Sequence, residues 1–103
     1  MKTLTFILYF VAILGLIEAT WHVVHTRGFS TAERSKFLRD ARSAVRQSGG
    51  PSDKMDFLRL KMENNYGGQW CCFYVNGGEF GGSWRTNKSI RINEGSKIIV
   101  CFN

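Results

Sequence analysis

The stretch that decides the fold runs from Tyr66 to Phe102 and reads YGGQWCCFYVNGGEFGGSWRTNKSIRINEGSKIIVCF. Residues 70–75 are an unbroken run of types that favour β-strands. The next three residues, Asn76-Gly77-Gly78, are of the types that adopt the positive φ angles of tight turns. Residues 89–92 and 97–102 are two more predicted strands, separated by turn residues. We therefore expect this part of the chain to form most of a β-sheet.

Within this stretch, the segment Phe80-Gly81-Gly82-Ser83-Trp84 is short, rich in glycine and flanked by turn residues. Such a segment binds weakly to its own sheet and is suited to a sheet edge, where another strand can add through backbone hydrogen bonds. Glycine also marks bulges and loops. The alternative is therefore an ordinary loop that carries two core aromatic residues.

The residues before this stretch predict one strand and two helices. Trp21 to Thr26 is a short strand, and the first helix follows, with Ser30 or Thr31 as its N-cap. Glu33 lies three residues after Ser30, which completes a capping box. Apolar residues recur at helical spacing as far as Val45, and the glycines at 49 and 50 are expected to supply a left-handed cap.

The second helix is expected to begin at Pro51-Ser52-Asp53, with Ser52 or Asp53 as N-cap. Its apolar residues form two stripes, which are Met55, Leu58 and Met62 on one side and Phe57 and Leu60 on the other. A helix that is apolar on two sides is predicted to lie between the sheet and the first helix. The order of elements predicts an α+β fold with two helices on one face of a small antiparallel sheet.

The first nineteen residues have the layout of a secretory signal. Lys2 gives a positive start, residues 4–17 are almost entirely apolar, and the small Ala19 precedes Thr20. The apolar run is short for a membrane span. We expect residues 1–19 to be a cleaved signal peptide, or a signal anchor in the alternative, and residues 20–103 to be one domain without a stable membrane span.

The predicted domain is basic, with an excess of positive charge between Arg27 and Arg46. The basic residues there outnumber two acids and are Arg27, Arg34, Lys36, Arg39, Arg42 and Arg46. Such a stripe suits nucleic acid, anionic lipid or sulfated glycan, or it is the solvated face of a surface helix. Aromatic residues do not interleave with the charges, as they do on nucleic-acid platforms. We therefore expect no nucleic-acid partner.

The three cysteines leave the redox compartment open. Successive strand residues point to opposite faces, so Cys71 and Cys72 cannot both pair with Cys101. Either one bridge forms within the chain, or all three are small buried residues of the sheet.

No pattern of an enzyme or a metal centre is found. The glycine pairs lack the Lys-Ser/Thr of a phosphate loop, and the acids are scattered. His22 and His25 are three residues apart, so in a strand they face opposite sides and cannot share a metal. The sequence thus predicts a protein that is not an enzyme and needs no cofactor or metal. The triplet Asn87-Lys88-Ser89 is an N-glycosylation acceptor if the chain enters the secretory path.

The pattern Lys61-x4-Tyr66-Gly67-x2-Trp70-x-Cys72, followed by Phe80-Gly81, resembles the signature of the small dynein light chain family. The predicted strand and the two predicted helices fall where that family has its first strand and its helices. The resemblance covers residues 20–103.

The resemblance implies a strand-exchanged homodimer of two-helix, antiparallel-sheet subunits without enzymatic activity. It implies that Phe80, Gly81, Gly82, Ser83 and Trp84 form the lent strand, and that short linear peptides add as an extra strand. The other wall of the peptide groove maps to Pro51, Ser52 and Asp53. By resemblance, the partners are a second copy and peptide segments such as those of dynein intermediate chain. The implied setting is the dynein complex on microtubules, in the cytoplasm and cytoskeleton.

The signal-like leader and the Asn87 triplet favour a second hypothesis. In this alternative the chain is a secreted, diverged member that acts as an extracellular effector or binding protein, through its basic helix.

Overall fold

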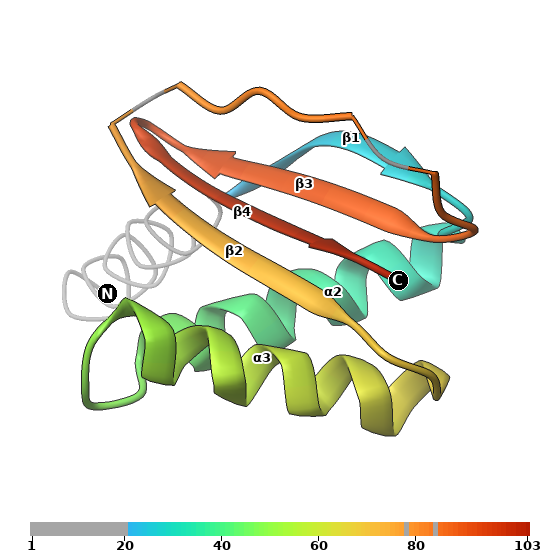
Figure 1. The fold of residues 1–103 in the computed structure, drawn as a ribbon, viewed down its shortest axis with the longest axis horizontal. Helices are drawn as coiled ribbons and strands as arrows, with labels where there is room; N and C mark the ends of the chain where they lie inside the picture. Colours follow the sequence, from blue (N-terminus) through green and yellow to red (C-terminus); the bar gives the residue numbers. More distant parts are fainter. Residues whose placement is uncertain (1–20, 78, 84) are drawn as a thin grey trace, which may run out of the picture.

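The structure is a computed structural model that describes residues 21–77, 79–83 and 85–103. Its elements, in chain order and with the labels of Figure 1, are β1 (His22–Arg27), α2 (Thr31–Val45), α3 (Pro51–Tyr66), β2 (Cys71–Asn76), β3 (Ser89–Glu94) and β4 (Lys97–Phe102). The four strands form one antiparallel sheet in the order β1-β3-β4-β2. Both helices cover the same face of this sheet (Figure 1). The predicted α+β fold is therefore confirmed, whereas the predicted signal peptide lies outside the described residues.

The two central strands, β3 and β4, are the most buried ones. β4 has the bounds that the sequence predicts, and its residues Ile98 to Cys101 are all buried. β1 and β2 each start and end one residue later than predicted, and β3 continues to Glu94. β1 and β2 have only one hydrogen-bonded neighbour each, so they are the two edges of the sheet among the described residues.

The first helix begins as its capping box predicts. The Ser30 hydroxyl accepts the Glu33 N–H at 3.2 Å, and the Glu33 carboxylate accepts the Ser30 N–H at 2.9 Å. The helix ends at Val45, earlier than expected, and its C-cap, Arg46, has right-handed helical geometry. Gly49, with φ of 101°, lies in the following turn, so the predicted left-handed glycine cap on this helix is wrong.

The second helix presents one apolar side to the core and not two. Met55, Leu58 and Met62 are buried and Phe57 is partly buried, whereas the side chain of Leu60 is 57% exposed. The prediction that both stripes are covered is therefore wrong for Leu60. In a fold of two layers, each helix has a side that faces solvent, and Leu60 lies on that side.

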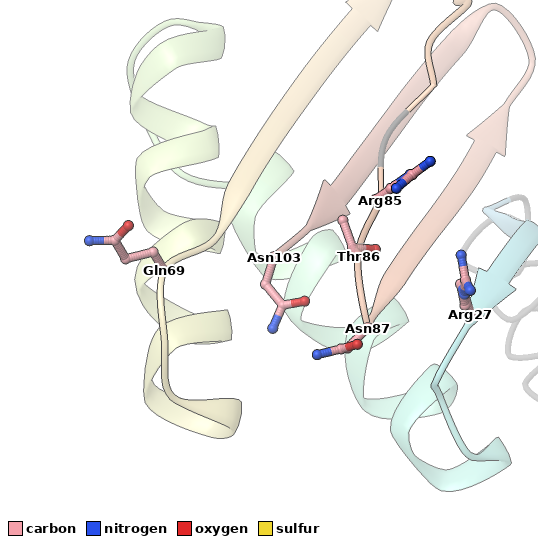
Figure 2. Close-up of a pocket in the computed structure, with 6 residues that line it drawn as sticks. All are labelled: Arg27, Gln69, Arg85, Thr86, Asn87 and Asn103. Carbon is pink, nitrogen blue, oxygen red and sulfur yellow. The ribbon is translucent and has the colours of Figure 1, made fainter.

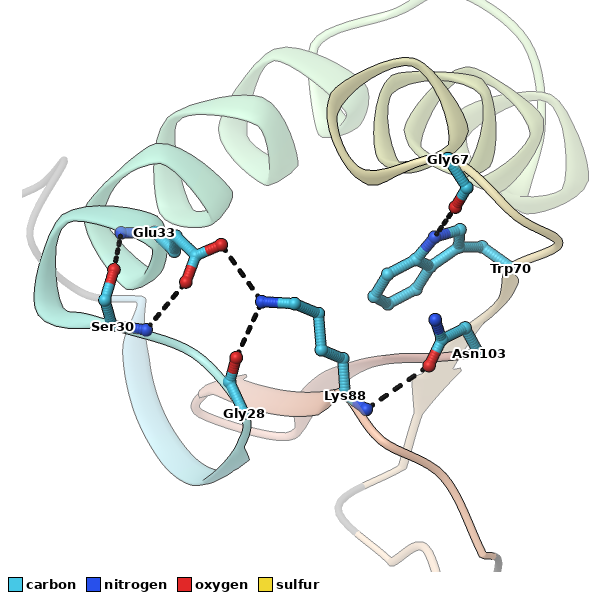
Figure 3. A network of polar contacts seen from close by, with 7 residues as sticks. All are labelled: Gly28, Ser30, Glu33, Gly67, Trp70, Lys88 and Asn103. Atoms are coloured by element: carbon cyan, nitrogen blue, oxygen red, sulfur yellow. Dashed lines mark hydrogen bonds and ion pairs between the residues drawn. The ribbon is translucent and has the colours of Figure 1, made fainter.

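The core lies between the helices and the sheet. Its residues are aromatic at the end near the start of β2. Phe29 makes edge-to-face contacts with Tyr66 and Trp70, with ring centroids 5.7 and 6.3 Å apart. The Trp70 indole N–H donates to the carbonyl of Gly67 at 3.0 Å, which satisfies its buried polar atom (Figure 3).

Lys88 joins the start of β3 to α2 and to these aromatic rings (Figure 3). Its ammonium donates to the Glu33 carboxylate at 3.0 Å and to the Gly28 carbonyl at 2.6 Å. It also lies over the rings of Phe29 and Tyr66, at 4.8 and 4.9 Å from their centroids. The Lys88 N–H donates to the Asn103 side chain, and the Asn103 N–H donates to the Lys88 carbonyl. These two hydrogen bonds hold the start of β3 against the end of β4.

Neither of the two described helices covers the other face of the sheet. Strand alternation places Ile98, Val100 and Phe102 on this open face, because Ile99 and Cys101 belong to the helix-covered core. Phe73 on β2 stacks on Phe102 with centroids 5.9 Å apart, and its side chain is 47% exposed. Neither of the two described helices is long and apolar enough to cross a bilayer.

Candidate functional site

The β2 edge of the sheet lies beside the first turn of α3. Between them is a hollow of about 200 Å³, lined by Pro51, Ser52, Met55, Cys72, Phe73 and Tyr74. Its walls come from a helix start and a strand edge, which is the arrangement that takes an extended chain as an added strand. We call this hollow the β2 groove.

The backbone of β2 alternates between its partner β4 and the β2 groove. The Cα atoms of Cys72 and Cys101 are 4.2 Å apart, close to the spacing of a non-hydrogen-bonded antiparallel pair. In such a pair the N–H and C=O groups point away from the neighbouring strand, and the direction reverses at each residue. Cys72 and Tyr74 therefore direct their backbone groups outward. Consistent with this phase, the Gly77 N–H, an odd number of residues further on, donates inward to the Ser96 carbonyl at 3.0 Å.

The helix wall of the β2 groove differs in one detail from the sequence prediction. The N-cap of α3 is Gly50, and neither Ser52 nor Asp53 fills that position. Pro51 takes the first helical position because its missing N–H needs no partner there. Asp53 is three residues inside, and its carboxylate accepts the Gly50 N–H at 3.0 Å. Pro51 and Ser52 thus line the hollow, and Asp53 supports the helix start without lining it.

A disulfide lies directly under the β2 groove. It joins Cys72 and Cys101, which are opposite each other on β2 and β4, and leaves Cys71 as an exposed free thiol. The sequence left this pairing open, because the choice between Cys71 and Cys72 depends on the register of two strands. The interpretation of all three cysteines as small buried residues is wrong for Cys71.

The glycine segment lies on the other side of the molecule from the β2 groove. It leaves the end of β2 and crosses to the start of β3 on the side of β1, and none of its described residues is in a strand (Figure 1). The Phe80 carbonyl accepts from Arg91 Nη1 at 3.5 Å, and Gly81, Gly82 and Ser83 are exposed. Trp84 lies outside the described residues. Within one chain, therefore, the segment and the predicted wall at Pro51–Ser52 are not brought together.

A second hollow of about 530 Å³ separates this segment from β1 and β3. It is lined by Val24, His25, Arg27, Gly82, Ser83, Thr86, Ser89 and Arg91. A third, of about 800 Å³, is lined by Arg27, Gln69, Arg85, Thr86, Asn87 and Asn103 (Figure 2). No pattern in the sequence predicted either hollow. The hollows depend on the antiparallel pairing of β1 with β3, because that pairing brings Arg27 next to the residues before Ser89.

The predicted acceptor Asn87 is exposed and borders the third hollow, so its side chain is open to modification. The described residues contain no group of three His, Cys, Asp or Glu side chains arranged to hold a metal ion. His22 and His25, both exposed, are part of β1.

Comparison with known proteins identifies the fold through structure. No family model matches the chain, and no curated protein matches it by sequence. Among solved structures, the dynein light chain-like domain of the Fasciola hepatica calcium binding protein FhCaBP2 superposes with a TM-score of 0.69 at 18% identity, covering 82% of this chain and 92% of that one. The fold is dynein light chain-like.

Two further structures agree with this assignment. The native crystal of the FhCaBP2 domain gives a TM-score of 0.68 at 17% identity and covers 81% of this chain and 89% of that one. The dynein light chain-like domain of CsTAL3 gives 0.66 at 15% identity, with coverages of 82% and 92%. At these identities the likeness concerns the dynein light chain-like fold, and the function has to be argued from the site.

Proposed function

We propose that this chain is a non-catalytic homodimeric binding protein that takes up short linear peptides by β-strand addition. In the dimer, the segment of residues 80–84 of one subunit lies along β2 of its partner, and a peptide then extends the same sheet next to the start of α3. The observation that carries the proposal is the free edge of β2, whose outward backbone groups at Cys72 and Tyr74 face the hollow beside Pro51 and Ser52.

Two other features support a partner subunit. On the face of the sheet that α2 and α3 leave uncovered, the exposed Phe73 stacks on the half-buried Phe102. Exposed aromatic side chains that stack beside buried aliphatic ones favour association with a second surface. Residues 79–83 are in no strand of their own sheet, which suits a segment that pairs with another subunit.

The direct test is to remove one outward N–H of β2. Tyr74→Pro deletes that N–H and leaves the ladder to β4 intact, because proline is tolerated where the N–H faces away from the neighbouring strand. Tyr74→Ala is the matched control, since it removes the same side chain and keeps the N–H. By light scattering at tens of micromolar, we expect dimers for the unchanged protein and for Tyr74→Ala, and monomers for Tyr74→Pro.

Peptide binding is tested on the same variants. A fluorescent peptide from dynein intermediate chain should bind the dimers and lose at least about tenfold in affinity with Tyr74→Pro, because the lent strand to which the peptide adds is then no longer held along β2. A strictly monomeric unchanged protein contradicts the strand exchange. A dimer that does not bind this peptide would agree with the strand exchange and would contradict a role as a light-chain component of the dynein motor complex.

The disulfide supports a second candidate, a secreted protein of the same fold that acts as an extracellular binder or effector. A bridge between Cys72 and Cys101 persists in oxidising compartments and is rare in the cytosol. Expression in eukaryotic cells tests it: a product in the medium that begins at Thr20 and carries a glycan on Asn87 is the expected result. A cytosolic product that retains Lys2 to Ala19 contradicts it.

A further inference from the structure

The hollows on the β1 side form one continuous basic surface. The hollow of about 530 Å³ and the hollow of about 800 Å³ share two lining residues, Arg27 and Thr86. We call the joined pair the basic trough. It lies between β1 and the segment that leads into β3, and its larger hollow continues across the end of the sheet to Asn103 and to Gln69, which comes just before β2 (Figure 2).

The charged side chains of the basic trough are all potential cations. Arg27, Arg85 and Arg91 line it together with His25, and none of the described residues that line it is Asp or Glu. The ion pairs among the described residues lie elsewhere, at Arg59 and at Lys88. Arg91 donates to two neutral acceptors, the Asn93 side chain at 3.3 Å and the Phe80 carbonyl at 3.5 Å. Within the described part of the chain, no carboxylate therefore forms an ion pair with the guanidinium groups of the trough.

The geometry of the donors fits an oxyanion. Figure 2 shows the Arg85 guanidinium extending toward β1, where the Arg27 guanidinium stands, with Thr86 between them and Asn103. The planar fork of arginine matches the oxygens of sulfate and phosphate and forms charge-assisted hydrogen bonds with them. The carboxamide groups of Asn87 and Asn103 add neutral donors and acceptors on the other side of Thr86 (Figure 2).

This part of the segment is fixed to its own subunit. The Thr86 hydroxyl donates to the Lys88 carbonyl at 3.1 Å, and the Lys88 N–H donates to the Asn103 side chain at 3.2 Å. Residues 86–88 therefore stay against the ends of β3 and β4, whichever subunit the residues 80–84 lie against. The side of the larger hollow formed by Thr86, Asn87 and Asn103 therefore does not depend on the exchange of strands, whereas the smaller hollow, lined in part by Gly82 and Ser83, forms only when the segment lies on its own subunit.

We propose that the basic trough binds sulfate or phosphate ester groups carried on a polyhydroxylated scaffold, that is, a sulfated or phosphorylated sugar or polyol. The arginines take the ester oxygens, and the hydroxyl and carboxamide side chains take the hydroxyl groups of the scaffold. A single tetrahedral anion would leave most of a trough of this size filled with water, and ligand sites of several hundred Å³ suit a larger molecule. This site is separate from the peptide groove and goes beyond the proposed function.

Calorimetric titration of the full domain, produced without glycosylation, tests the proposal with three probes. These are a heparin-derived hexasaccharide, inositol hexakisphosphate and inorganic phosphate, at low and at near-physiological salt. We expect at least one of the two esters to bind more tightly than inorganic phosphate, and to weaken as the salt concentration rises. The ester that binds better identifies the source of the anionic groups.

Two double variants of equal charge change locate the site. Arg27→Gln with Arg85→Gln removes two positive charges from the basic trough, and we expect a loss in affinity of at least about tenfold. Arg34→Gln with Arg39→Gln removes two from exposed positions of α2, and we expect a loss of less than about threefold, from long-range charge alone. Arg85→Lys keeps the charge and loses the fork, so its affinity should fall between these values.

Several results would overturn the assignment. Equal losses in the two double variants would mean that binding follows net charge and not the trough. Absence of binding by both esters at low salt, or equal affinity for inorganic phosphate, would reject the ester ligand. A measurement on the unchanged protein guards against unfolded variants: the side-chain amide resonances of Asn87 and Asn103 should shift on adding the ester, and their constancy would also reject the site.

Discussion

The two edges of the sheet are held in different ways. At the β2 edge, a disulfide under the strand and an apolar helix start fix a narrow hollow. At the β1 edge, a glycine-rich segment without regular structure crosses over a wide, polar trough, and single polar contacts such as that of Lys88 hold the region together. The first edge is rigid and presents backbone, whereas the second presents charged side chains.

This difference indicates how one small sheet can serve two kinds of ligand. Strand addition needs an edge whose amide groups are fixed in position, because groups that are already ordered lose less conformational entropy when the added hydrogen bonds form. Anion binding depends on charge density and tolerates a looser frame. The variants below are chosen to weaken one edge at a time.

The largest expected effect comes from opening the disulfide. Cys72 and Cys101 are separated by 29 residues, and a bridge over a loop of that length contributes about 3 kcal/mol through the unfolded state. Urea denaturation of the protein with and without a thiol reductant should show a loss of that order. Cys71→Ser, which removes the exposed thiol and keeps the bridge, is the control and should change the free energy of unfolding little. Equal stability in both redox states would mean that the β2 edge does not depend on the bridge.

A glycine at the β1 edge gives the next largest effect. Gly28 has φ of 76°, and a Cβ there would lie 2.3 Å from the Asn87 carbonyl oxygen. Gly28→Ala should therefore lower the free energy of unfolding by about 2 kcal/mol, from left-handed backbone strain and the displacement of residues 87 and 88. Gly81→Ala is the matched control, because a Cβ at that position meets nothing within 4 Å. Comparable losses by thermal or urea denaturation would contradict the close packing at Gly28.

The smallest effect is a pH dependence at Glu33. Hydrogen bonding to the Ser30 backbone N–H, and then the contact with Lys88, lowers the pKa of this carboxyl below its usual 4.5. A lowered pKa in the folded state stabilises the fold above about pH 4.5, and this contribution disappears as the pH falls through the folded-state pKa. Glu33→Gln should therefore be less stable than the unchanged protein at pH 7, and the difference should shrink toward about pH 3.

The control for this experiment is Glu79→Gln, at an exposed acid. Urea titrations at three pH values compare the two variants. If Glu33→Gln and Glu79→Gln behave alike, the Glu33 contacts do not contribute to the stability of the β1 edge.

Local signals in the sequence predicted the elements well. The bounds of β4 follow from its apolar run between turn residues, and the start of α2 follows from the Ser30–Glu33 spacing. The start of α3 at Pro51 was also predicted, but its N-cap was wrongly assigned to Ser52 or Asp53, because these residue types are good N-caps in general, while Pro51 suits the first helical position and leaves the cap to Gly50. Both outcomes depend on interactions within a few residues.

Features that depend on the pairing of distant strands could not be predicted in the same way. The choice of Cys72 as the partner of Cys101 requires the register of β2 against β4. The basic trough brings together Arg27 and Arg85 from opposite halves of the chain, and no local pattern marks such a meeting. The walls of the β2 groove at Pro51 and Ser52 came from resemblance to a family, and the structure places them beside an open strand.

Lys88 illustrates how a surface residue can be withdrawn from the surrounding solution. Its amine is enclosed by a carboxylate, a carbonyl and two aromatic rings, and only a quarter of its side chain is exposed. An amine whose protons are all engaged reacts slowly with acylating reagents and is a poor substrate for enzymes that modify lysine. We therefore expect acylating reagents to label Lys88 more slowly than exposed lysines. Labelling of Lys88 would indicate that the contacts around its amine, on the β1 side of the molecule, have opened.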